Sequence, residues 1–138
     1  MVVGLYEFLL KVSKLKKTQE KIDAIKYNDS IPLRIILQGA FDPSVVWLLP
    51  EGTPPFRANK FDEPKALHLE VSKFYLFIEG GNNNLKPVKR ENLFIQMLER
   101  VNEDDANLLI AMKDKKSPFK GITKDIVMAA FPGLLPNE

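Results

Sequence analysis

Apolar residues recur at steps of three and four along most of this chain, in stretches separated by capping residues and prolines. That spacing places side chains on one face of an α-helix, whereas a half-buried strand would need strict alternation. Residues 4–15 are the clearest case and place these side chains on one face: Leu5, Phe8, Leu9, Val12 and Leu15. The pattern predicts an all-α fold, with helices packed through their apolar faces.

Capping signals divide the next part of the sequence into two further helices. Thr18 is a candidate N-cap for a helix over residues 19–27, with Ile22 and Ile25 facing inward. Ser30 is the N-cap of the third, and Pro32 falls in its first turn, where a missing N–H costs little. The inward side chains of this helix are Leu33, Ile36, Leu37 and Phe41.

Residues 42–64 interrupt the helical pattern, because five prolines forbid a continuous helix there. The apolar run at 45–49 predicts an extended segment that crosses and packs on the helices, with a partner-binding patch as the alternative. A chain of 138 residues can bury one hydrophobic core, so a single domain over residues 1–138 is expected.

The second half of the sequence predicts four more helices, about seven in all. One covers residues 67–79 and stops at Gly80-Gly81, with five inward residues: Leu67, Val71, Phe74, Tyr75 and Ile78. The next covers residues 88–101, and its inward residues are Phe94, Met97, Leu98 and Val101.

The last two predicted helices each begin at a capping residue. Asn102 precedes one whose first turn holds Glu103, Asp104 and Asp105, which we expect to form a solvated acidic face. Thr123 precedes the other, which runs to residue 131 and ends at Pro132-Gly133.

Few residues in the sequence could perform catalysis. His68 is the one histidine, no cysteine is present, and no glycine pattern matches a phosphate-cradling loop. We therefore expect a protein that is not an enzyme and that binds no cofactor or metal. No run approaches the roughly 18 apolar residues of a membrane span, and the first fifteen residues lack the features of a secretory signal. These absences predict a cytoplasmic protein.

The formal net charge of +2 hides two basic stretches. Residues 9–26 contain six lysines against two acidic residues, a local charge of +4. Residues 113–124 contain five lysines against one aspartate, again +4. The second stretch leads to Gly121-Ile122-Thr123, where free amides at a helix start can hold a phosphate. The alternative is a lysine-rich solvated loop with Thr123 as a simple cap.

The residues around that turn carry a resemblance. The sequence Gly121-Ile122-Thr123-Lys124-Asp125-Ile126 and the later Pro132-Gly133-Leu134-Leu135-Pro136 resemble the end of one domain in phage-type (T-even-like) ATP-dependent DNA ligases. That domain is their N-terminal helical DNA-binding domain. Near the amino end, Lys17-Thr18-Gln19-Glu20-Lys21 is similar to its first helix connection. Ligases often place arginine just before the glycine of the turn, where this chain has Phe119 and Lys120.

The resemblance implies a non-catalytic, stand-alone tailed-phage protein that holds duplex or nicked DNA by its backbone during replication or repair in the infected cell. No Lys-x-Asp-Gly nucleophile motif is present. The predicted DNA contacts are Lys115, Lys116, Lys120, Gly121, Ile122, Thr123 and Lys124, with Lys86, Lys89 and Arg90 as a second set. The alternative is a protein adaptor that binds a replisome component or host polymerase through Trp47, the proline-rich segment and residues 131–135.

Overall fold

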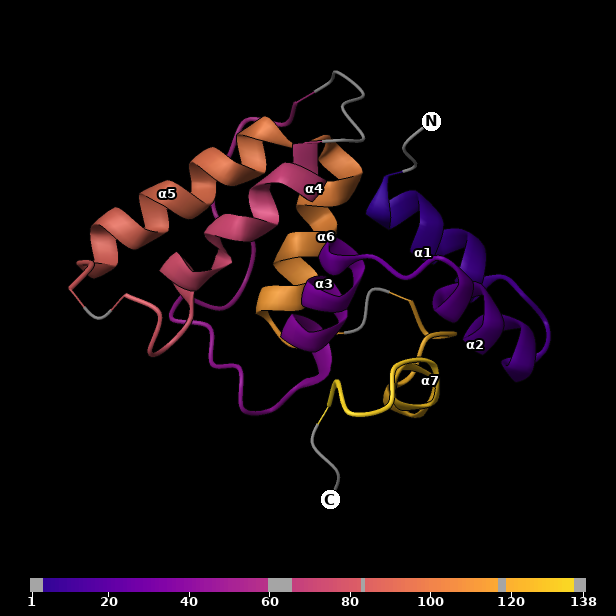
Figure 1. The fold of residues 1–138 in the computed structure, drawn as a ribbon. Coiled ribbons are helices and arrows are strands. Elements are labelled where there is room, and N and C mark those ends of the chain that lie inside the picture. The colour runs from indigo at the N-terminus through magenta and orange to yellow at the C-terminus, as the bar shows by residue number, and fades with distance from the viewer. Residues whose placement is uncertain (1–3, 60–65, 83, 117–118, 136–138) are drawn as a thin grey trace.

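Helix α6 (Glu103–Lys113) lies at the centre of the molecule, and three other helices, α1, α3 and α5, pack against it (Figure 1). Leu108, Leu109 and Met112 of α6 are each at most 2% exposed. The computed structural model describes residues 4–59, 66–82, 84–116 and 119–135. The predicted end of the crossing segment, residues 60–64, lies outside these ranges.

The described residues form seven α-helices and one short 3-10 helix, which confirms the predicted all-α, single-domain fold. In chain order these are α1 (Leu5–Ser13), α2 (Thr18–Tyr27), α3 (Ile31–Phe41), α4 (Ala66–Glu70), the 3-10 helix η1 (Val71–Phe77), α5 (Pro87–Arg100), α6 and α7 (Lys124–Ala130). The described part of the proline-rich segment, residues 42–59, crosses from the end of α3 without regular structure, apart from one isolated β-bridge between Trp47 and Ile78.

Local signals placed most helix starts correctly. The hydroxyl of Ser30 accepts a hydrogen bond from the Leu33 N–H at 3.2 Å, and the amide oxygen of Asn102 accepts one from the Asp105 N–H at 2.8 Å. Thr18 is not the cap of α2 but its first residue. The carboxylate of Glu20 instead accepts a hydrogen bond from the Lys17 N–H at 3.2 Å, which satisfies one of the orphan donors at that end.

The prediction of one helix over residues 67–79 is wrong. Helix α4 ends at Glu70 and continues as η1, whose three-residue period buries Val71, Phe74 and Phe77 together. Tyr75, predicted to face inward, is 54% exposed. The next residues are extended, because the crossing segment supplies hydrogen-bond partners: Leu48 N–H to Phe77 C=O at 2.7 Å and Glu79 N–H to Val46 C=O at 2.9 Å.

The predicted solvated acidic face of α6 is only partly present. Glu103 and Asp104 are exposed, but Asp105 is fully buried and accepts a hydrogen bond from the Tyr6 N–H at 3.0 Å. This bond ties the first turn of α1 to the first turn of α6. Leu15 also departs from its prediction, because α1 ends at Ser13 and leaves the Leu15 side chain 36% exposed.

Candidate nucleic-acid interface

Helices α2 and α7 lie side by side (Figure 1). Their side chains form the walls of an open groove of about 470 Å³. The ammonium of Lys21 on α2 donates a hydrogen bond to the Gly121 carbonyl, just before α7, at 2.8 Å. The two bonded residues are 100 positions apart in the chain. The residues that line the groove are Thr18, Lys21, Ile22, Lys120, Gly121, Thr123, Asp125 and Ile126.

This packing joins the two basic stretches of the sequence into one surface. A Cβ atom built on Gly121 would lie 2.6 Å from the carbonyl oxygen of Ser13, so the turn at 119–123 rests directly on the end of α1. The connection from α1 to α2 begins there and carries three exposed lysines, Lys14, Lys16 and Lys17. On the other side of the groove Lys120 is exposed and Lys124 is half-buried. The acidic side chains of these two helices are those of Glu20 and Asp23 on α2 and of Asp125 on α7, which lines the groove.

The turn itself serves partly as an internal anchor. Ile122 is 3% exposed and its N–H donates to the Phe119 carbonyl at 3.1 Å, so the prediction that Ile122 contacts DNA is wrong. Thr123 is exposed, and its hydroxyl accepts from the Ile126 N–H at 3.4 Å, as a capping residue should. A glycine at position 121 permits the close approach of a second backbone. The backbone that it admits is that of Ser13.

Replacing Gly121 with alanine should therefore destabilise the groove. The added methyl would lie 2.6 Å from the Ser13 oxygen and 2.9 Å from the Lys21 ammonium, and the backbone oxygen cannot move as a flexible side chain can. We expect a loss of about 1–3 kcal/mol in the free energy of unfolding, measured by urea denaturation. A variant as stable as the parent protein would contradict this packing of the turn.

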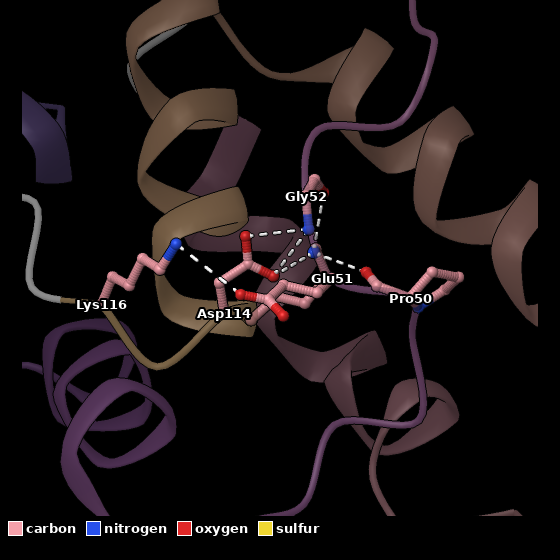
Figure 2. Close-up of polar contacts among 6 residues, drawn as sticks. Pro50, Glu51, Gly52, Asp114 and Lys116 are labelled. Atoms are coloured by element: carbon pink, nitrogen blue, oxygen red, sulfur yellow. Dashed lines mark hydrogen bonds and ion pairs between the residues drawn. The ribbon is translucent and has the colours of Figure 1, made fainter.

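Lys113 is buried, and it fixes the crossing segment to the end of α6. Figure 2 shows Pro50 and Gly52 of that segment beside Asp114. The Lys113 ammonium donates hydrogen bonds to the carbonyls of Pro50 at 2.8 Å and Gly52 at 2.9 Å, and pairs with Asp114 at 2.5 Å. Asp114 in turn accepts from the Gly52 N–H at 3.2 Å. All three donors of Lys113 thus have acceptors within the chain.

Lys115, one of the predicted DNA contacts, is an exposed residue whose ammonium is hydrogen-bonded within the chain. Its ammonium donates to the carbonyls of Gly39 at 2.8 Å and Asp42 at 2.6 Å, at the end of α3. Lys115 is the one non-glycine residue with positive φ in the described part of the chain, at 60°. Desolvation by burial lowers the pKa of Lys115, although the nearby Asp42 carboxylate acts in the opposite direction.

Asp42 completes this second anchor. Burial alone would raise the pKa of Asp42, but hydrogen bonds from Ser44 and Gln38 and the charge of Lys115 together lower it. The remaining lysine of the loop, Lys116, forms an exposed ion pair with Glu51 at 3.7 Å. Exposed pairs of this kind contribute little to stability, so Lys116 remains available to solvent.

The second predicted contact set does not form one surface with the first. Arg90 is 6% exposed and its guanidinium donates to the carbonyls of Leu76, Asn82 and Leu85, at 3.1, 3.4 and 2.9 Å. The prediction that Arg90 contacts DNA is therefore wrong. Lys86 and Lys89 are exposed at the start of α5, which lies on the opposite side of the molecule from α7 (Figure 1).

Of the residues expected to form an adaptor surface, Trp47, Phe131 and Leu135 pack within the fold, whereas much of the described part of the proline-rich segment is exposed. The indole N–H of Trp47 donates to the Gly39 carbonyl at 3.0 Å, and its ring packs edge-on against Phe74. Phe131 and Leu135 are each 3% exposed, and the guanidinium of Arg34 lies over the Phe131 ring at 4.6 Å. These side chains stabilise the fold and are not presented to a partner.

Within the described ranges, no group of three or more histidine or acidic side chains is placed to hold a metal ion. In the same ranges, no helix has the length and the apolar composition that crossing a membrane requires.

Most of the chain matches one known protein family. Residues 8–117 match DUF6433, a family of unknown function. The matched region contains α2 and the crossing segment, and it ends before the turn at 119–123 and α7. No curated protein and no solved structure matches the chain. Because the match covers well over half of the sequence, the chain belongs to the DUF6433 family.

Proposed function

We propose that this protein is a non-catalytic DNA-binding module that holds the sugar-phosphate backbone in the groove between α2 and α7. One observation carries the proposal: the contact of Lys21 with Gly121 brings two lysine-rich stretches from opposite ends of the sequence onto one surface. Lys120 lines the groove together with Lys21, and four other lysines are close in sequence to its walls: Lys14, Lys16, Lys17 and Lys124. Such a local basic surface, and not the net charge of +2, is what nucleic-acid binding requires.

The chemistry of the groove favours backbone contacts over base recognition. Lysine is a point charge that suits phosphate, whereas bidentate base reading in the major groove relies mainly on arginine, asparagine and glutamine. None of those three residue types is found among the described residues that line the groove. We therefore expect binding with little sequence preference, driven by release of counterions from the DNA.

The same lining favours double-stranded over single-stranded DNA. Proteins that hold single strands combine basic grooves with aromatic side chains on which bases stack. Among the described residues, no aromatic side chain lines this groove. The resemblance to ligase DNA-binding domains, which stays a prediction, also favours a duplex and a nick. On this proposal the protein acts in phage DNA replication or repair, in the cytoplasm of the infected cell.

Salt-titrated binding tests this proposal. Labelled intact duplex, nicked duplex and single-stranded DNA of one sequence would be titrated with the protein, and affinity measured by fluorescence anisotropy. If the groove neutralises roughly three phosphates, the logarithm of affinity should fall with the logarithm of salt with a slope of about −2.7. Affinity that does not change with salt, or a clear preference for the single strand, would overturn the proposal.

A further inference from the structure

A second cavity, separate from the basic groove, lies between the crossing segment and α5. Its volume is about 240 Å³. The walls are mainly apolar and are formed by Leu49, Pro54, Pro55, Phe94 and Ile95. Lys113 lies at its edge and fixes the Pro50 and Gly52 carbonyls, so the wall formed by the crossing segment is held in place.

Glu91 is the unusual residue of this cavity. Its side chain lines the apolar wall and is half-buried, and no hydrogen bond or ion pair to another described residue involves it. Its neighbours three and four positions away on α5 and at the helix start are Pro87, Val88, Phe94 and Ile95, none of which carries a charge. A carboxylate in such a place is normally paired.

The other charges around the cavity compensate one another. Lys113 pairs with Asp114 at 2.5 Å, and Glu51 pairs with Lys116 at 3.7 Å. Glu51 is 77% exposed, so water screens its charge, and Glu91 is the one half-buried charge without a described partner among the described residues that line the cavity. An occupant that fits would bury an apolar group against Phe94 and Ile95 and present a cation to Glu91.

We propose that this cavity binds a small organic cation, an amine with a single ring or a branched aliphatic body. An engineered apolar cavity of about 150 Å³ accommodates one benzene ring. A volume of about 240 Å³ therefore suits one ring with a short chain that ends in an ammonium. A small cavity of this kind limits affinity, so we expect dissociation constants in the millimolar to high-micromolar range. The proposal does not depend on DNA binding.

Phenethylammonium is a suitable probe, with 2-phenylethanol and phenylacetate as neutral and anionic analogues of similar size. Each would be titrated at pH 7 and constant ionic strength into the isotope-labelled protein, and amide shifts followed by NMR. We expect phenethylammonium to shift the amides around Glu91, Phe94 and Ile95. The alcohol should bind about tenfold more weakly, and phenylacetate should not bind there.

Two variants complete the test. Glu91→Gln preserves the shape of the side chain and should weaken phenethylammonium binding about tenfold, to the level of the alcohol. Glu103→Gln makes the same chemical change on the exposed start of α6 and should leave the affinity unchanged. The proposal fails if the cation causes no shifts at millimolar concentration, if phenylacetate binds equally well, or if Glu91→Gln binds like the parent protein. If Glu91→Gln does not fold, the relative affinities of the cationic, neutral and anionic ligands for the parent protein still test the proposal.

Discussion

Replacing Lys113 with methionine should lower the free energy of unfolding by about 3–5 kcal/mol. The Lys113 side chain is 2% exposed. Its ammonium donates hydrogen bonds to the Pro50 and Gly52 carbonyls and pairs with the Asp114 carboxylate. Methionine fills a similar volume but leaves Asp114, 8% exposed, as a buried charge without its cation. Urea denaturation followed by circular dichroism measures the loss.

Lys116→Met is the matched control for this change. Lys116 forms its ion pair with Glu51 at the surface, where the two side chains are 69% and 77% exposed. Its replacement should change stability by less than about 0.5 kcal/mol. If Lys113→Met loses no more than Lys116→Met, the crossing segment is not anchored through Lys113.

Replacing both Lys17 and Lys120 with glutamate, which reverses two charges, should lower affinity for nicked duplex by about 100-fold at moderate salt. The two residues stand on the two sides of the groove and are exposed, so their replacement should leave the fold intact. Each charge-assisted contact with a phosphate that is lost costs roughly a factor of ten in affinity. Anisotropy titrations measure the effect, and the salt dependence should become shallower at the same time.

Lys86→Glu with Lys89→Glu makes the same change in net charge at the start of α5, on the other side of the molecule (Figure 1). This pair should reduce affinity by less than about threefold, because exposed charges beyond a Debye length are largely screened. Equal losses from both pairs would show that total charge, and not the groove, governs binding. Asp125→Asn removes the acidic side chain of the groove wall, so this change should raise affinity for DNA.

Helix positions could be predicted from the sequence because their causes are local. The Ser30 and Asn102 caps and the apolar spacing of α3, α5 and α6 act within a few residues of one another. The division of the fourth predicted helix into α4 and η1 could not be foreseen. It depends on backbone bonds from Val46 and Leu48, which lie about thirty positions earlier.

The interaction partner of each charged side chain was the feature hardest to predict from the sequence. Lys115 and Arg90 look like solvent-exposed cations in the sequence, yet their acceptors are backbone carbonyls, for Lys115 more than seventy positions away. The packing of α2 against α7 could not be predicted from the sequence either. For this reason the predicted contact set does not include four lysines of the basic stretch at 9–26: Lys14, Lys16, Lys17 and Lys21.

The bond between Lys21 and Gly121 also bears on how fast a ligand could be captured. It joins the two walls of the groove in the free protein, so the width of the groove is set before any DNA arrives. A cleft that needs no rearrangement adds no slow step, and long-range attraction then controls the encounter. Rapid-mixing traces should accordingly show one exponential phase whose rate increases linearly with DNA concentration.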